Sequence, residues 1–313
     1  MKQNCSVIVP VYNSSASLAE LIQRLDKVLS LAFQEYEMIF VIDGSPDDSW
    51  KVIQELTLVN QRIRAFNLMR NYGQHNALFC GIMEARYEFI ATLDDDLQNP
   101  PEELPKMLNE IEKGFDVIYG TPQQEKHGLF RNWASVLTKN VLSTVLGAEQ
   151  ARFVGSYRLF RSSLRKAFEN FHGPYVNIDV LLSWASVRIG SITVNHEDRK
   201  LGRSSYSFGK LVTHAFNLVT GFSTIPLRIS SITGFFFAFV GIIILLYVLV
   251  RRLFLGVAVP GFTFLASMIA FFSGAMLFAL WIIGEYLARM YFRIMDKPKY
   301  VIRDSIDHFD VPK

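Results

Sequence analysis

The stretch FIATLDDDLQNPPEE, residues 89–103, joins an apolar segment to three consecutive carboxylates. Its first part, Phe89–Leu93, is a short apolar run of the kind that predicts a buried strand. Because side chains alternate along a strand, we expect Asp94 and Asp96 to share one face and Asp95 to point to the other. Three adjacent carboxylates repel one another unless a positive charge lies among them.

The acidic run predicts a D-x-D metal site that also holds a diphosphate. Mg²⁺ and Mn²⁺ take oxygen ligands, and Mg²⁺ often completes its coordination with substrate phosphates. The alternative is a solvated acidic turn before a helix that begins near Pro101, because proline is common in the first turn of a helix. A motif this short also occurs by chance, so the rest of the chain has to decide.

The segments before the acidic run alternate between apolar strands and helices. Strands are predicted at Cys5–Tyr12, Tyr36–Ile42 and Arg64–Met69, and helices near residues 17–31, 48–60 and 76–85. Ser17 and Glu20 form a capping box at the first helix, and Asp48 or Ser49 is expected to cap the second. This alternation predicts an α/β fold with a doubly wound, mostly parallel sheet.

Ligands bind such a sheet outside the carboxyl ends of its strands. Three polar segments follow predicted strands at that edge, namely Pro10–Asn13, Asp43–Ser45 and Asp94–Asp96. We therefore expect them to meet in one crevice.

Apolar residues are concentrated after residue 228. Ile229–Val250 and Phe262–Ile283 carry no charge and are long enough to cross a bilayer, which predicts a two-helix transmembrane hairpin. Cationic residues flank the hairpin on both sides and outnumber Arg251 and Arg252 in its connection, so we expect a multi-pass inner-membrane protein with both termini cytoplasmic.

The segment before the hairpin is basic and rich in hydroxyl groups. Arg199, Arg203 and Ser204 surround a glycine, a composition that favours contact with a phosphate. The alternative is a solvated loop attracted to an anionic membrane surface. Residues 207–228 repeat apolar side chains at helical spacing, as an interfacial amphipathic helix or a core helix would.

Several function classes receive no support from composition. The net charge is only +3, so bulk charge does not favour nucleic-acid binding. Cys5 and Cys80 lack the spacing of metal ligands or of a disulfide framework, which fits a reducing compartment. A strand is predicted almost at the first residue, so no signal peptide is expected.

Four motifs lie at the ends of the predicted strands, namely VIVPVYN (Val7–Asn13), IDGSPDDS (Ile42–Ser49), RNYGQHNAL (Arg70–Leu78) and DDDLQNPPEE (Asp94–Glu103). Together they resemble the family 2 glycosyltransferases with the GT-A (Rossmann-like) fold, and in particular the branch that includes dolichyl-phosphate mannose synthases and undecaprenyl-phosphate glycosyltransferases. The resemblance continues into the apolar tail and covers almost the whole chain.

The resemblance implies roles for matching positions. The nucleotide would be bound by Pro10, Tyr12, Asn13, Asp43, Ser45, Asn71 and Asp95. The catalytic carboxylates would be Asp94 and Asp96, which with Gln98 would hold Mg²⁺ or Mn²⁺ and the donor diphosphate. The acceptor phosphate would meet Arg131 and Ser135, joined by Arg199, Arg203 and Ser204 of the basic segment.

Three positions depart from the family pattern. Ile42 replaces the usual acidic or amide residue, and Asp95 replaces the usual small residue inside D-x-D. Gly120-Thr121-Pro122 lacks an arginine often found there, so acceptor binding is expected to depend more on Lys126 and Arg131.

The sequence thus predicts inverting transfer of a sugar from a nucleotide diphosphate to a polyprenyl phosphate, with aminoarabinose-, glucose- and mannose-type donors all open. The alternatives are a processive polysaccharide synthase, whose Gln-x-x-Arg-Trp motif is missing, and a catalytically silent sugar-nucleotide-binding scaffold. Aromatic faces at Phe235–Phe237 and Phe271–Phe272 would pack against lipid or a second copy of the chain. The predicted divisions are a catalytic domain (1–206), a junction (207–228), the hairpin (229–283) and a cytoplasmic tail (284–313).

Overall fold

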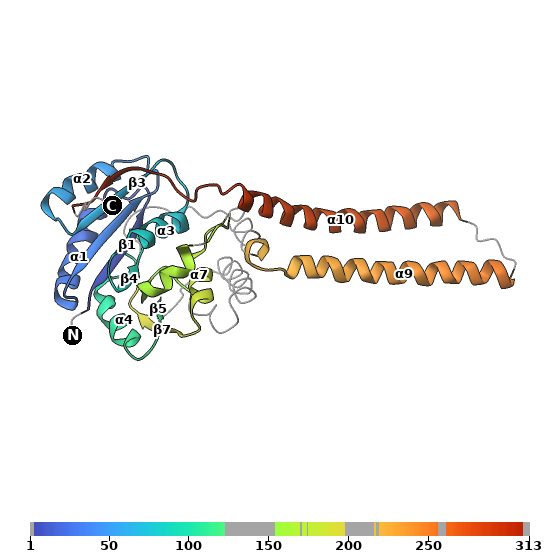
Figure 1. Ribbon diagram of the computed structural model, residues 1–313, viewed down its shortest axis with the longest axis horizontal. Coiled ribbons are helices and arrows are strands. Elements are labelled where there is room, and N and C mark those ends of the chain that lie inside the picture. Colours follow the sequence, from blue (N-terminus) through green and yellow to red (C-terminus); the bar gives the residue numbers. More distant parts are fainter. Residues whose placement is uncertain are drawn as a thin grey trace.

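The computed structural model describes residues 3–122, 154–169, 171–173, 175–197, 216, 219–255 and 261–308. Figure 1 shows an α/β domain from which two long helices project side by side. The predicted acceptor residues Arg131, Ser135, Arg199, Arg203 and Ser204, together with Lys126 and most of the junction, lie outside the described residues.

Within the described part of the chain, eight strands form one sheet in the order β7-β5-β6-β4-β1-β2-β3-β8. They are β1 (Cys5–Val11), β2 (Tyr36–Ile42), β3 (Ile63–Leu68), β4 (Phe89–Thr92), β5 (Val117–Pro122), β6 (Arg158–Arg161), β7 (Ile189–Val194) and β8 (Ile302–Ile306). Only β6 and β8 run antiparallel to their neighbours. The predicted doubly wound, mostly parallel sheet is confirmed.

Helices cover both faces of the sheet. They are α1 (Leu18–Ala32), α2 (Ser49–Val59), α3 (Gln74–Glu84), α4 (Leu104–Ile111), the short α6 (Lys166–Glu169) and α7 (Ile178–Ala185), with 3-10 turns at Pro101–Glu103 and Ser162–Arg165. On one face, α1 and α4 pack with Val7 and Val9 of β1, and on the other α3 and α7 pack with Ile8. Alternate residues of this central strand therefore enter opposite cores, which is why its sequence is almost entirely apolar.

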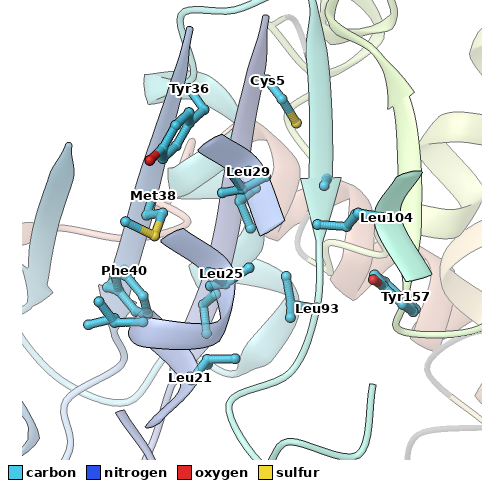
Figure 2. Packing of buried hydrophobic residues seen from close by; sticks show 14 of the residues in the cluster. Cys5, Leu21, Leu25, Leu29, Tyr36, Met38, Phe40, Leu93, Leu104 and Tyr157 are labelled. Carbon is cyan, nitrogen blue, oxygen red and sulfur yellow. The ribbon is translucent and has the colours of Figure 1, made fainter. Parts of the chain in front are cut away.

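The spacing of apolar residues decides how the helices sit. Leu21, Leu25 and Leu29 recur every fourth residue of α1 and face Met38 and Phe40 of β2 (Figure 2). This spacing places all three leucines on one stripe of the helix.

On the other face, the helix α3 lies close to the sheet at a glycine. A Cβ added to Gly81 would lie 2.4 Å from a methyl carbon of Ile8, so any larger residue would push the helix away from β1. The close packing holds the N-terminal end of α3 at the carboxyl edge of the sheet.

The two projecting helices are α9 (Ile225–Leu255) and α10 (Phe262–Ile294). Each contains a segment long and apolar enough to cross a membrane, Ile225–Val248 and Phe271–Ile294. Only 6% of each segment is buried inside the protein, and aromatic edges such as Phe237 against Phe271 join the pair. These two helices correspond to the predicted hairpin.

After α10 the chain returns to the sheet. The strand β8 pairs antiparallel with β3, so residues assigned from the sequence to a tail complete one edge of the catalytic sheet. The mixed polar sequence of β8 does not predict its pairing with β3, because five residues are too few to show a clear alternation of apolar and polar side chains.

A buried ion pair joins β6 to α7. Arg158 and Asp179 are 3% and 4% exposed, and two hydrogen bonds of 2.7 and 3.0 Å run from the guanidinium to the carboxylate. Tyr119 of β5 donates to the same carboxylate, and Arg158 also donates to Thr92 at the end of β4. Four elements around the carboxyl edge therefore share one charge pair.

Replacing Arg158 with methionine is expected to lower the free energy of unfolding by about 3–5 kcal/mol, because the Asp179 charge would stay buried without its partner. The matched control is Arg161→Met on the same strand, whose surface ion pair with Glu88 spans 3.4 Å and is worth about 1 kcal/mol or less. Thermal unfolding of the full chain in detergent compares the two variants. Equal losses would contradict a special role for the buried pair.

Candidate active site

The acidic run lies in a turn rather than in a strand. The strand β4 ends at Thr92, and the backbone of Leu97 is left-handed with φ 62°. The prediction that strand alternation divides the three carboxylates is therefore wrong, because the strand ends before they begin. The backbone of the turn, and not the alternation of a strand, sets the directions of the three Asp side chains.

Asp95 points back toward β1. Its carboxylate accepts a hydrogen bond of 3.1 Å from the backbone N–H of Tyr12. Burial, together with the neighbouring charges of Asp94 and Asp96, raises the pKa of Asp95 to about 6, although the Tyr12 amide opposes this shift. Asp95 thus differs from its neighbours by connecting the acidic turn to β1.

A serine of α1 holds the same turn. The Ser17 hydroxyl donates to the carbonyl oxygen of Asp95 over 2.8 Å and to that of Ser14 over 3.0 Å. The predicted capping box at Ser17 is wrong, since its side chain makes no capping bond. Its hydroxyl instead ties the start of α1 to the acidic turn.

Asp94 and Asp96 are partly exposed at the carboxyl edge. One oxygen of Asp94 accepts a bond of 2.6 Å from the Gln74 side chain, and one oxygen of Asp96 accepts a bond of 3.1 Å from the Gln98 backbone. An all-oxygen pair of this kind fits Mg²⁺ or Mn²⁺, which take their other ligands from water and phosphate. The described residues contain no group of three His, Cys, Asp or Glu side chains placed to hold a metal ion by themselves.

Asp47 organises the loops that follow β1 and β2. Its carboxylate accepts hydrogen bonds from the hydroxyls of Ser45 and Ser49 and from the backbone N–H of Ser15. These contacts hold the pKa of Asp47 well below its usual range against the opposing effect of burial. The Ser45 hydroxyl in turn accepts the N–H of Asn13 over 2.7 Å.

The sequence did not indicate that Asp47 organises these loops, because it predicted Asp48 or Ser49 as the N-cap of the second helix. The side chain of Asp48 makes no capping bond, and Asp47 takes the N–H of Ser49 instead. The available signal was an aspartate with a serine two residues away on either side, a spacing that suits local hydrogen bonding.

Asp43 joins the loop after β2 to the loop after β3. It is 3% exposed, and its two oxygens accept the N–H groups of Tyr72 and Gly73 at 2.7 Å each. Burial raises the pKa of this carboxyl despite both amides. Gly44 is needed at this contact, because its φ is +59° and a Cβ there would lie 2.4 Å from the backbone nitrogen of Asn71.

The other residues predicted to bind the nucleotide differ in exposure. The side chain of Tyr12 is 51% exposed, and Asn13 and Asn71 are exposed, whereas Pro10 is buried within β1. Together with Asp43 and Ser45 they come from the ends of β1, β2 and β3, so the structure brings the predicted segments to one edge.

His75, in the first turn of α3, contacts the start of α7. Its Nδ1 accepts the backbone N–H of Ile178 over 3.3 Å, which places the proton of the neutral ring on Nε2. This geometry makes the ring a link between two helices and leaves it poorly suited to remove a proton through Nδ1.

The end of β7 also reaches the acidic turn. The backbone N–H of Glu197 donates to the carbonyl of Gln98 over 3.0 Å, and Asn195 donates to Glu103 over 2.7 Å. Arg24 of α1 bonds to both Glu197 and Glu102. The chain that leads toward the apolar hairpin therefore departs from beside the D-x-D turn.

Comparison with known proteins identifies the family. The model of the family described as glycosyl transferase family 2 matches residues 6–171. This chain belongs to glycosyl transferase family 2. It is 34% identical over 304 residues to an undecaprenyl-phosphate 4-deoxy-4-formamido-L-arabinose transferase of Proteus mirabilis, covering 96% of this chain and 93% of the relative. A transferase of the same name from Klebsiella pneumoniae is 34% identical over 301 residues, with 95% and 92% covered.

Solved structures agree on the fold of this glycosyltransferase. Glucosyl-3-phosphoglycerate synthase from Mycobacterium tuberculosis, in complex with Mn²⁺, uridine diphosphate and phosphoglyceric acid, superposes with a TM-score of 0.53 at 13% identity over 70% of this chain and 77% of that one. The expected family and fold are confirmed. The assignment of individual residues to donor, metal and acceptor stays a prediction.

Asp47→Ala is expected to loosen the loops at residues 13–15 and 45–49, because the Asp47 carboxylate accepts the Ser15 N–H and the hydroxyl of Ser45. Hydrogen exchange at these amides should accelerate, and the affinity for the preferred nucleotide should fall about tenfold, or ~1.4 kcal/mol. Asp48→Ala is the control, since it removes an exposed neighbouring carboxylate. Unchanged exchange in Asp47→Ala would contradict the organising role.

Proposed function

We propose that this glycosyltransferase moves a sugar from a nucleotide diphosphate donor to the phosphate of undecaprenyl phosphate at the cytoplasmic face of the inner membrane. One observation carries the proposal: both chain segments that connect the sheet to the apolar hairpin meet the sheet at its carboxyl edge. The same edge holds Asp43 and the D-x-D turn.

Strand directions establish this observation. The strand β7 is parallel to β5 and, through the antiparallel β6, to β4, so its end at Val194 lies at the carboxyl edge. On the return path, Ile302 pairs with Leu68 at the carboxyl end of β3. A donor bound at this edge would therefore face the side from which a lipid acceptor arrives.

We assign the nucleotide to the ends of β1, β2 and β3. Tyr12 and Asn13 offer exposed groups for a base and ribose, and Asn71 lies across from them beyond Gly44. Asp43 and Ser45 hold these loops in register, and Asp95 fixes the distance between β1 and the acidic turn.

We assign the donor diphosphate and a divalent cation to Asp94 and Asp96, with Gln98 beside them. The proposal rests on their all-oxygen chemistry and partial exposure, since the likeness to the Mn²⁺-containing synthase concerns the fold. When bound, the cation would neutralise charge on the leaving diphosphate. The two carboxylates would orient that diphosphate relative to the incoming lipid phosphate.

The transfer is a single displacement. An oxygen of the lipid phosphate forms a bond to the anomeric carbon, the bond from that carbon to the donor diphosphate breaks, and the diphosphate leaves with the electron pair. The configuration at the carbon inverts. The attacking phosphate is already ionised at neutral pH, so the enzyme needs no general base, in agreement with the linking position of His75.

The acceptor phosphate is assigned to the basic segment after Glu197, with Arg199, Arg203 and Ser204, and to Arg131 and Ser135. These side chains lie outside the described residues, and their role rests on the sequence. The relatives are named for 4-deoxy-4-formamido-L-arabinose, which makes that sugar the first donor to test.

Asp96→Ala is expected to reduce lipid-dependent transfer by ~100-fold or more. Asp96 would help to hold the cation that stabilises the charge developing on the leaving diphosphate in the transition state. The assay measures nucleotide release and glycolipid formation by detergent-purified protein from UDP- and GDP-sugars, with Mg²⁺ or Mn²⁺ and with or without undecaprenyl phosphate. Glu110→Ala, at a surface ion pair of α4, is the control. Near-normal turnover in Asp96→Ala would overturn the metal assignment, and nucleotide binding without consumption of any donor would favour a scaffold.

The proposed orientation predicts which positions a membrane-impermeant thiol reagent reaches. In cells, a cysteine at Gly261, in the hairpin connection, should be labelled from outside, whereas a cysteine at His308 should react only after the inner membrane is opened. Both positions are exposed, and the native Cys5 and Cys80 are buried, so background labelling should be low. The reverse pattern would place the catalytic domain on the opposite face.

A further inference from the structure

We propose that β8 and Asp307 form a latch that fastens the catalytic domain to the apolar hairpin, and that Asp307 is a positioning residue for transfer to the membrane-borne acceptor. The proposal rests on the proposed function for its kinetic consequence. Its structural part concerns how the domain is held relative to α10.

The latch begins with backbone pairing along the outer edge of β3. The strand β8 enters at Leu68 and runs antiparallel to β3 as far as Ala65, which pairs with Ile306. Two further bonds extend the contact at the entry point, from the N–H of Met69 to the carbonyl of Val301 and from the side chain of Arg303 to the carbonyl of Met69. Figure 1 shows this segment crossing the domain from α10 to the C-terminal end.

A buried charge network closes the far end of the latch. Arg64 of β3 is 1% exposed and donates to Glu37 of β2 and to Asp307, each over 2.8 Å. Arg86 also donates to Asp307, over 2.7 Å. Asp307 therefore balances a guanidinium in the core of the catalytic domain, and it stands directly after β8.

A second set of contacts joins the domain to the hairpin near the entry of β8. The His172 ring lies 2.8 Å from the Asp296 carboxylate at the end of α10, and the Lys299 ammonium lies over the rings of Phe79 and Phe171. Phe171 also stacks on Phe222, ahead of α9, with ring centres 6.2 Å apart.

The two sets of contacts lie at opposite ends of β8. A strand of five residues spans about 16 Å, so the attachments are separated by roughly the height of the sheet. One attachment alone would leave a pivot near the membrane, whereas two separated attachments resist rotation of the domain. Fixing the carboxyl edge in this way would hold the donor at a constant height and angle above the bilayer, which is the positioning that an in-line displacement requires.

A purely structural role makes a different prediction. If β8 only covers the edge of β3 against aggregation, its loss would reduce stability without changing the angle between domain and hairpin in the folded molecules. The charge of Asp307 separates the two roles, because it can be removed while the backbone pairing of β8 is kept.

The test compares Asp307→Asn with Asp304→Asn. Both remove one carboxylate charge at β8, but Asp304 is exposed, and among the described residues its carboxylate accepts one bond, of 3.3 Å, from Asn67. Spin labels are attached at Glu55→Cys on α2 and Arg293→Cys on α10, both of which are exposed. Double electron–electron resonance measures the distance between the two labels, and this distance changes when the domain rotates relative to the hairpin. The buried native cysteines take up little label.

The distance distribution is expected to broaden in Asp307→Asn and to match the parent in Asp304→Asn, with Asp307→Glu restoring most of the parent width. Hydrogen exchange should report a rise of about tenfold in the detached population of β8, or ~1.4 kcal/mol. An unchanged distribution in a folded Asp307→Asn protein would overturn the latch. These measurements need no substrate, so they stand apart from any failure of the proposed reaction.

The kinetic part is tested on the same variants. Asp307→Asn should raise KM for undecaprenyl phosphate or lower the rate of transfer, while the affinity for the donor nucleotide stays at the parent value, because Asp307 lies at the sheet edge opposite the nucleotide loops. A broadened distribution with unchanged lipid kinetics would contradict the positioning role. An equal fall in nucleotide affinity would assign the effect to general loosening of the domain.

Discussion

The common direction of the central strands is the constraint on which the rest of this structure depends. Because β1, β2, β3 and β4 are parallel, their carboxyl ends meet at one edge, and the polar loops that follow them have to share that edge. The loops do not merely lie close together. Asp43 crosses from the end of β2 to the loop after β3, and Asp95 crosses from the acidic turn to β1. The geometry of the candidate active site is therefore built from carboxylates that bind backbone N–H groups of neighbouring loops.

The same constraint relates the carboxyl edge of the sheet to the apolar hairpin. The segments before α9 and after α10 both meet the sheet at its carboxyl edge, so the domain presents its polar loops toward the hairpin. A glycosyltransferase that uses a lipid acceptor needs this arrangement, because the phosphate of the lipid stays at the membrane surface. Buried ion pairs at Arg158 and Arg64 then hold the antiparallel β6 and β8 in place beside the parallel core.

Much of the fold could be predicted from residue patterns. Nearly continuous apolar runs located β1 and β2 to within a residue, because most positions of a strand covered on both faces are apolar. The long uncharged segments predicted α9 and α10 by their length and hydropathy, which suit a membrane crossing. The predictions of strand alternation through the three carboxylates and of a capping box at Ser17 were wrong. Each assumed regular secondary structure at a position where a contact with a distant segment directs the side chains instead.

The sequence by itself determined the first four strands with the helices between them, the apolar hairpin and the family, because these depend on local periodicity and on motifs of adjacent residues. Only the tertiary structure decided which carboxylates bind inward and which side chains connect distant loops. The bonds from Ser15 to Asp47 and from Arg64 to Asp307 are examples, since each joins segments that only folding brings together. A hydrogen bond between distant segments leaves no periodic trace, whereas burial of a whole face does.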